Sequence, residues 1–294
     1  MPDFSTARQL LRSLKRSSGY SRLQKTMVEG WRLRNADRRL LPSFIIIGAQ
    51  KAGTTSLYHY LQGHPQILAP SRKELFFFDG GRHQSQDVYI EKGLPWYRLH
   101  FPLTGKLPNQ LLTYEATTSY LYSPVAAERI AETLPDVRLI AILRDPIKRA
   151  ISHFQHNLRK GRETLSFSDA IRMEEERISD IAMATNTLPS GSRLFSYKAR
   201  GRYFEQLVRY QSFLDKGHLL VLSSEQLFAD PQGVANRIFR FLGLSECHHS
   251  RPTRQHNSAP NKISIDPDDI SLLKEYFAKP NEDLFNLIGQ RFAW

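Results

Sequence analysis

The chain has 294 residues, 40% of them hydrophobic, and its 41 lysines and arginines against 29 acidic residues give a formal net charge of +12. Length and composition predict a globular protein with a substantial core, in one large domain or two smaller ones. The charge predicts an anionic partner: a nucleotide, an acidic glycan, nucleic acid or a membrane surface.

The location of the protein is predicted from what the sequence lacks. Cys247 is the only cysteine, which excludes an internal disulfide and favours a reducing compartment. No apolar run approaches the ~20 residues that span a bilayer. The start of the chain also lacks the charged-then-apolar layout of a secretory signal, so we expect a cytoplasmic protein. His248 and His249 stand beside Cys247, but no second ligand pair follows at the usual spacing, and no metal site is expected.

Residues 1–41 are predicted to form a basic helical extension at the N-terminus. Apolar residues recur among many arginines and lysines in this segment, which is typical of amphipathic helices. Such a helix most often packs on its own domain, and the alternative is contact with a membrane surface or a partner. Residues 42–294 are expected to form a single domain.

The stretch 42–57 predicts a phosphate site. Residues 44–47 are apolar and β-branched, as in a strand buried on both faces. A turn ending at Gly53 follows, and then a helical pattern over 54–62. The free N–H groups and the positive dipole end of that helix favour an anion, and Lys51 adds a full charge. The ATPase loop G-x-x-x-x-G-K-[ST] differs, because its lysine follows the second glycine.

Two further predicted strands end at polar residues. Residues 111–115 end at Glu115, and residues 137–143 run into Arg144. Ligands of open parallel sheets lie outside the carboxyl ends of the strands, so we expect Glu115 to face the cleft and not the core. Ser152 lies almost two turns into the helix after Arg144. These two residues are therefore predicted to contact one phosphate, through a guanidinium fork and a hydroxyl.

The remaining elements predict the fold class. Short strands are expected at 66–69 and 218–222, and helices lie between the predicted strands. This alternation predicts a P-loop-type three-layer α/β fold, with a central, mainly parallel sheet flanked by helices. Further helices are expected over 125–134, 167–178, 198–214, 231–242, 266–277 and from Pro280 to the end of the chain.

Several segments resemble those of the PAPS-dependent sulfotransferases. IIIGAQKAGTTSL at 45–57 is similar to that family's loop for the 5′-phosphosulfate, and ILRDP at 142–146 resembles its 3′-phosphate site. TYEATTSYL at 113–121 resembles the segment that presents the catalytic glutamate, and KELFFFD at 73–79 is similar to a segment near the acceptor cleft. The resemblance covers residues 42–294 in order. It points to the glycan-modifying group typified by heparan sulfate 3-O- and N-sulfotransferase domains, and to their bacterial relatives.

The resemblance implies a single sulfotransferase domain that moves the sulfuryl group from PAPS to a hydroxyl or amine of an acceptor, a saccharide or glycolipid. It implies Glu115 as the general base and Lys51 as the residue that stabilises the leaving PAP. PAPS is the implied co-substrate, and neither a metal nor nucleic acid is expected to take part. The implied nucleotide contacts are Lys51, Ala52, Gly53, Thr54, Thr55, Arg144, Ser152, Asn257, Ser258 and Lys262.

Two other functions remain open. A P-loop nucleotide kinase or NTPase would share the strand, loop and helix, but the GK[ST] sequence and an aspartate placed to hold Mg²⁺ are absent. A non-enzymatic nucleic-acid-binding protein fits the positive charge, but the sequence has no helix-turn-helix, zinc or RNA-binding signature. A metal requirement for turnover would favour the first, and salt-dependent DNA binding without PAP affinity would favour the second.

Overall fold

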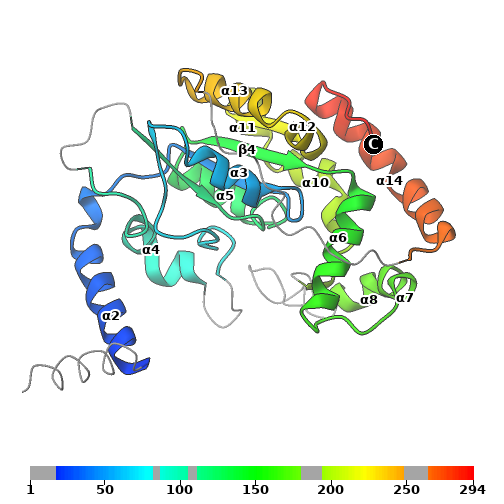
Figure 1. Cartoon of the computed structure of the whole chain (residues 1–294), viewed down its shortest axis with the longest axis horizontal. Coiled ribbons are helices and arrows are strands. Elements are labelled where there is room, and N and C mark those ends of the chain that lie inside the picture. The colour runs from blue at the N-terminus through cyan, green and yellow to red at the C-terminus, as the bar shows by residue number, and fades with distance from the viewer. Residues whose placement is uncertain (1–17, 82–86, 105–110, 180–193, 248–263) are drawn as a thin grey trace, which may run out of the picture.

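The computed structural model describes residues 18–81, 87–104, 111–179, 194–247 and 264–294. Its centre is a five-stranded sheet in the order β2-β3-β1-β4-β5, and all neighbouring strands are parallel. Helices flank the sheet (Figure 1), which confirms the predicted three-layer α/β fold. The strands are β1 (Phe44–Gly48), β2 (Ile67–Leu68), β3 (Leu112–Ala116), β4 (Arg138–Leu143) and β5 (Leu219–Ser223).

The helices account for most of the other described residues. In Figure 1, β4 points toward α6, and α14 runs beside α6 and α10. The helices are α2 (Ser18–Arg34), α3 (Thr54–Leu61), α4 (Val88–Arg98), α5 (Ala126–Thr133), α6 (Pro146–Arg159), α7 (Phe167–Arg172), α8 (Glu174–Ser179), α10 (Tyr203–Val208), α11 (Gln211–Asp215), α12 (Ser224–Ala229), α13 (Pro231–Leu242) and α14 (Pro267–Ile288), with short 3₁₀ turns η1 (Ala36–Arg38) and η2 (Ala199–Gly201).

The middle strand, β1, is buried along its whole length, as its apolar run predicted. β1 pairs with β3 on one side, where Ile45 lies opposite Glu115, and with β4 on the other, where Ile46 lies opposite Ile140. The rings of Phe44 and Tyr114 stack between β1 and β3 with centroids 5.1 Å apart. The turn after β1 therefore emerges at the centre of the carboxyl edge of the sheet.

The predicted helix over 198–214 is wrong, because the chain there forms three short elements, η2, α10 and α11. The break is explained by close packing at Gly201. A Cβ atom at this position would lie 2.8 Å from the Phe277 ring and 2.9 Å from Pro146. The backbone thus passes directly against α14 and the start of α6, where a regular helix with side chains does not fit.

Two other predicted boundaries are corrected. The single helix over 167–178 is divided into α7 and α8. Pro280 does not start a new helix but lies inside α14, which continues to Ile288 and ends at Gly289 in the left-handed region, φ 62°. A proline inside a helix removes one backbone hydrogen bond and crowds the carbonyl four residues earlier, and packing of α14 against the domain retains the helix around it.

The C-terminal residues pack back onto the domain. Phe285, Phe292 and Trp294 form a cluster of rings, and the Trp294 indole N–H donates to Glu225 over 3.2 Å. Glu225 in turn accepts from the backbone N–H of Asp145 over 3.2 Å. The C-terminus thus supports the start of α6.

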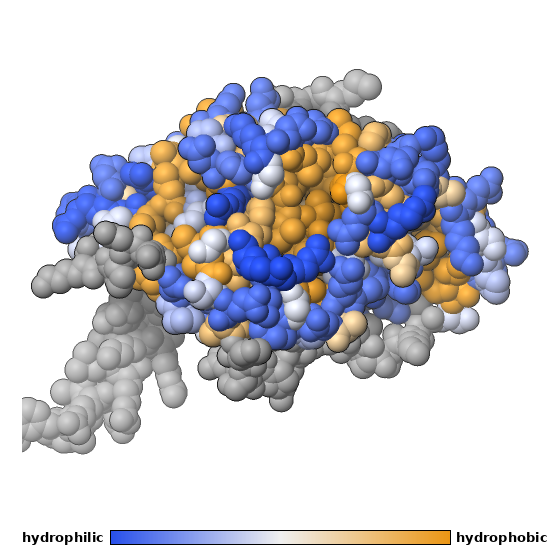
Figure 2. Space-filling view, turned by 90° about the horizontal axis from the view of Figure 1, so that it is seen from above, coloured by the Kyte–Doolittle hydropathy of each residue, from blue (hydrophilic) through white to orange (hydrophobic). Residues whose placement is uncertain are grey.

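Apolar residues reach the surface on the side that carries α13 and α14, and Figure 2 shows them running down the middle of that face between hydrophilic borders.

The N-terminal helix α2 confirms the expected helical segment over residues 18–34. The expectation that it is covered by its own domain does not hold for residues 26–34, because all of them except Arg32 are exposed. Met27 is 73% exposed and Trp31 54%, although the Arg39 guanidinium lies 5.5 Å from the Trp31 ring centroid. Within the described residues, no helix has the length and apolar character needed to cross a membrane. The division into an extension and a single domain stays a prediction.

Candidate active site

The turn between β1 and α3 has the geometry of an anion site. Gly53 precedes α3 with φ 96°, in the left-handed region, and carries no side chain to cap the helix. The first helical backbone bond runs from the Leu57 N–H to the Gly53 carbonyl, so the amides of Thr54 and Thr55 precede the bonded part of the helix. Such amides are donors for an anion at the positive end of the helix dipole. Glycine is required at position 53, because a Cβ there would lie 3.1 Å from the Phe228 ring.

Lys51 lies in this turn among other cations. Its burial, and then the charges of Arg159, Arg144 and Arg149, lower its pKa to about 8. The Arg144 guanidinium also donates to the Lys51 carbonyl over 3.1 Å, which fixes the end of β4 against the turn. The lysine is still mainly charged at pH 7, and an anion bound beside it would raise its pKa again. The predicted Lys51 and Arg144 are thus brought together.

Helix α6 starts as the sequence predicted and carries Ser152 at the end of its second turn. Asp145 caps the helix by accepting from the N–H of Ile147 over 2.9 Å, and Pro146 takes the first helical position. Ser152 shares a helix face with His156, four residues on, and Arg159, seven residues on. Burial and the charges of Lys51 and Arg159 lower the pKa of His156 to about 4.

A pair of residues that the sequence analysis placed only near the acceptor cleft lies at the anion site. The Lys73 ammonium donates to the Thr55 hydroxyl over 2.9 Å and lies 3.4 Å from the Thr54 hydroxyl. It also forms an ion pair with Glu74 over 3.8 Å. The Glu74 carboxylate accepts from the N–H and the hydroxyl of Thr118, over 3.3 and 3.2 Å, and its side chain stays 25% exposed. Burial raises the pKa of Glu74, and Lys73 opposes that rise.

Glu115 does not face the cleft, and this prediction is wrong. Its side chain is completely buried, and its carboxylate accepts from the hydroxyls of Tyr97 and Tyr120, both over 2.5 Å, and of Thr117 over 2.8 Å. Burial raises its pKa to about 7, against the lowering effect of these hydroxyls. Tyr97 is a buried residue of α4. That helix supplies the side chain that closes the site over Glu115.

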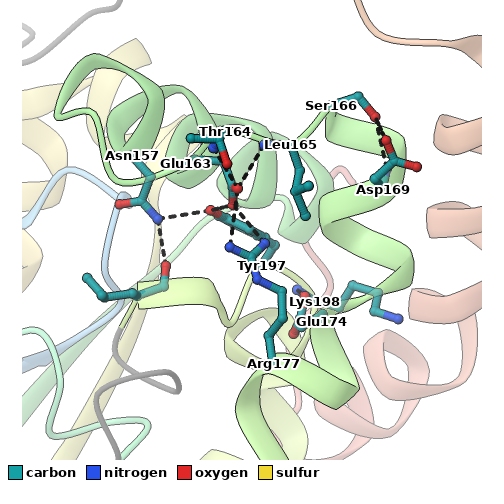
Figure 3. A network of polar contacts seen from close by, with 11 residues as sticks. Asn157, Glu163, Thr164, Leu165, Ser166, Asp169, Glu174, Arg177, Tyr197 and Lys198 are labelled. Atoms are coloured by element: carbon teal, nitrogen blue, oxygen red, sulfur yellow. Dashed lines mark hydrogen bonds and ion pairs between the residues drawn. The ribbon is translucent and has the colours of Figure 1, made fainter.

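A buried polar network fixes the second half of α6 (Figure 3). The Glu163 carboxylate accepts from the Tyr197 hydroxyl over 2.7 Å and from Arg177 over 2.9 Å. Asn157 of α6 donates to the same tyrosine hydroxyl over 3.0 Å. Figure 3 shows Arg177 and Tyr197 pointing at Glu163 from separate segments. Arg149, which is fully buried, donates to the backbone carbonyls of Ser196 and Tyr197. The helix that carries Ser152 is therefore held firmly in place.

The structure thus assembles part of the predicted donor site. Lys51, residues 52–55 and Arg144 lie together at the carboxyl edge of the sheet, and Ser152 lies on α6, the helix that follows β4. Asn257, Ser258 and Lys262 lie outside the described residues. Sequence reasoning missed the role of Lys73 and Glu74 at this edge. The available signal was a lysine–glutamate pair separated by Leu75 from the aromatic run 76–78.

Comparison with known proteins identifies the family. A family model described as the sulfotransferase domain matches residues 41–263. The chain belongs to this family. It is therefore a PAPS-dependent sulfotransferase, and the predicted resemblance is confirmed. The kinase and nucleic-acid-binding alternatives are set aside by this membership.

Three proteins of the family illustrate how similar this chain is to known sulfotransferases. A membrane-associated sulfotransferase of Dictyostelium discoideum is 26% identical over 86% of this chain and 66% of its own length. The human heparan sulfate glucosamine 3-O-sulfotransferase 6 is 29% identical over 87% of this chain and 75% of its own length. A solved sulfotransferase from Alicyclobacillus acidocaldarius is 30% identical, covers 86% of this chain and 98% of its own, and superposes with a TM-score of 0.69.

Arg144 and Ser152 predict a preference for a nucleotide with a 3′-phosphate. We expect PAP to bind more tightly than AMP. Arg144→Ala should lower the affinity for PAP by about 10–100-fold, the effect of losing a charged hydrogen bond, and leave the affinity for AMP little changed. Ser152→Ala should lower the affinity for PAP by a smaller factor. Calorimetry with both nucleotides measures this. Lys148→Ala is the control, because this α6 cation is 58% exposed and pairs with Asp145. Equal affinity for PAP and AMP would contradict the assignment.

Proposed function

We propose that this sulfotransferase moves the sulfuryl group from PAPS to a hydroxyl or amine of a saccharide acceptor, with Glu74 as the general base. The observation that carries the proposal is the Lys73–Glu74 pair. The Lys73 ammonium donates to the Thr55 hydroxyl at the start of α3. Because Glu74 pairs with Lys73, its partly exposed carboxylate lies next to the anion site.

The donor end of the reaction rests on the turn after β1. The amides of residues 52–55 and the Lys51 ammonium would hold the 5′-phosphosulfate, and Arg144 with Ser152 would hold the 3′-phosphate. As the bond between sulfur and the bridging oxygen breaks, negative charge grows on the departing 5′-phosphate. Lys51 and the amides are placed to stabilise that charge. Lys73, on the other side of Thr55, adds a second cation near the transferred group.

The acceptor end rests on the choice between two glutamates. A general base must come within hydrogen-bond distance of the proton that it removes. The Glu115 carboxylate is completely buried, and three hydroxyls already occupy it. Glu74 is 25% exposed, and although burial raises its pKa, the charge of Lys73 opposes that rise. The acceptor oxygen or nitrogen would form the new bond to sulfur while its proton passes to Glu74. Glu74 therefore replaces Glu115 in our proposal.

A saccharide acceptor is supported by charge and by the relatives. The loop at the end of α6 exposes Arg159, Lys160 and Arg162, and the charge of Arg159 contributes to the lowered pKa of Lys51. An acidic polymer would gain from such cations beyond the reacting group. The human relative is named for the glucosamine of heparan sulfate. The acceptor class of this chain is inferred from these two facts.

Substitution of each glutamate separates the two assignments. Glu74→Gln should lower turnover by about 10²–10⁴-fold, the usual contribution of a general base, and keep PAP affinity within about twofold. Glu115→Gln should cost less than about tenfold, because the amide oxygen can still accept from Thr117 and Tyr120. Transfer from labelled PAPS and PAP calorimetry measure both effects. Near-normal turnover of Glu74→Gln, with loss in Glu115→Gln, would return the role of base to Glu115.

The acceptor class is tested by labelled-sulfate transfer to heparan sulfate and to glycan, lipid and small-molecule pools of a cell extract. We expect label in the glycan or glycolipid pools. For the polymer, Lys160→Ala with Arg162→Ala should raise KM by about threefold or more and leave kcat little changed, because both cations lie beyond the reacting group. Lys148→Ala again controls for net charge. Label confined to small-molecule alcohols would contradict the saccharide proposal.

Helix α2 supports a peripheral contact with an anionic membrane surface. It exposes Met27 and Trp31 beside basic residues, and one relative is named as membrane-associated. We expect the chain to co-sediment with vesicles containing phosphatidylserine and not with phosphatidylcholine alone. Met27→Ala with Trp31→Ala should abolish this, and Leu272→Ala, an exposed apolar residue of α14, should not. Unchanged binding of the double variant would refute the contact. The cytoplasmic location stays a prediction, tested by fractionation of cells.

A further inference from the structure

The buried Glu115 is connected to the backbone of the segment that carries Glu74. The Thr117 hydroxyl donates to Glu115 and accepts from the Leu75 N–H over 3.0 Å and, more weakly, from the Phe76 N–H over 3.5 Å. The Tyr120 hydroxyl also donates to Glu115, and it accepts from the Phe77 N–H over 2.9 Å and the Phe78 N–H over 3.3 Å. One carboxylate thus reaches four consecutive amides through two hydroxyls.

The direction of these bonds follows from the donor and acceptor inventory. In its ionised form the Glu115 carboxylate can only accept, and each hydroxyl has a single hydrogen to donate. When Thr117 and Tyr120 give that hydrogen to Glu115, their lone pairs remain for the amides of residues 75–78. The carboxylate therefore sets both hydroxyls in the orientation that holds the segment.

The segment needs such support because its backbone is strained. Glu74 has φ 59° and Phe76 has φ 57°, and both lie in the left-handed region that side chains other than glycine's rarely adopt. Residues 75–78 belong to no helix or strand of the sheet, so the regular backbone ladders do not hold them. The Glu74 N–H is tied to β3, through the Ala116 carbonyl over 2.9 Å. Strained conformations of this kind persist where the surroundings determine them by several contacts.

We propose that Glu115 is a positioning residue. Through Thr117 and Tyr120 it fixes the backbone of residues 74–78, and so directs the Glu74 carboxylate toward the acceptor. This inference rests on the proposed role of Glu74 as base. It gives the second glutamate a function that needs no contact with substrate, and it explains why a carboxylate is buried at the end of β3.

Hydrogen exchange tests the positioning role without an acceptor. Tyr120→Phe and Thr117→Val each remove one hydroxyl link, and we expect amide exchange in the peptide over residues 72–79 to rise by about tenfold or more. Tyr97→Phe is the matched control. Its hydroxyl donates to the same carboxylate, but no contact of that hydroxyl reaches the amides of 75–78, and its ring packing on Phe77 is kept. Equal exchange in Tyr97→Phe and Tyr120→Phe would overturn the proposal.

Kinetics test whether this link acts through Glu74. Tyr120→Phe should lower kcat by about tenfold or more for transfer from PAPS to heparan sulfate or to whichever pool accepts label, with PAP affinity within about twofold. In the Glu74→Gln background the same change should cost nothing further, because the directed group is gone. If the losses of kcat caused by the two substitutions multiply in the double variant, the link is overturned. If Glu74→Gln alone turns over normally, the proposed base fails, and the exchange experiment still decides whether the Thr117 and Tyr120 hydroxyls that Glu115 orients hold the segment.

Discussion

Like charges crowded at the end of β1 are the constraint on which the rest of the site depends. Lys51 lies close enough to Arg144, Arg149 and Arg159 for their charges, added to burial, to lower its pKa to about 8. Such a cluster raises the free energy of the folded chain until an anion neutralises it. The fold holds the cluster together by other means: the capped start of α6, the C-terminal contact through Glu225, and the Glu163 network behind α6. These supports keep the cations in place for a ligand with two phosphates.

Glu74 and Glu115 have the same side chain in two different environments, and our account gives them different roles. Glu115 is buried, ringed by hydroxyls, and has its pKa raised to about 7. Glu74 is partly exposed and paired with Lys73, which itself touches the first turn of α3. The group that can meet an acceptor is the one beside the anion site. The buried one is suited to hold the backbone that carries it. In our account Glu115 positions the backbone segment that carries Glu74, and Glu74 acts on the acceptor.

The sequence predicted those parts of the site that local patterns encode. The apolar runs of β1 and β4, the lysine in the turn, and the Asp145–Pro146 start of α6 all follow from composition and periodicity. The same patterns were enough to predict a parallel three-layer fold. The predicted donor site rested on these elements, which is why Lys51 and Arg144 meet as expected.

The remaining features depend on contacts between distant residues. Glu115 was predicted to face the cleft from its place at a strand end, but Tyr97 of α4 covers it. The Lys73–Glu74 pair reaches the site through a left-handed backbone and a hydrogen bond to Thr55, which periodicity does not reveal. The break at Gly201 likewise comes from packing against Phe277.

A crystal structure of the complex with PAP and a bound acceptor fragment tests the central claim most directly. The account predicts the 5′-phosphate on Lys51 and the amides of residues 52–55, and the 3′-phosphate on Arg144 and Ser152. It also predicts the Glu74 carboxylate within about 3.2 Å of the acceptor hydroxyl or amine, with Glu115 still buried against its three hydroxyls. A complex in which Glu115 has turned out to meet the acceptor, or in which PAP binds away from Lys51, would contradict it.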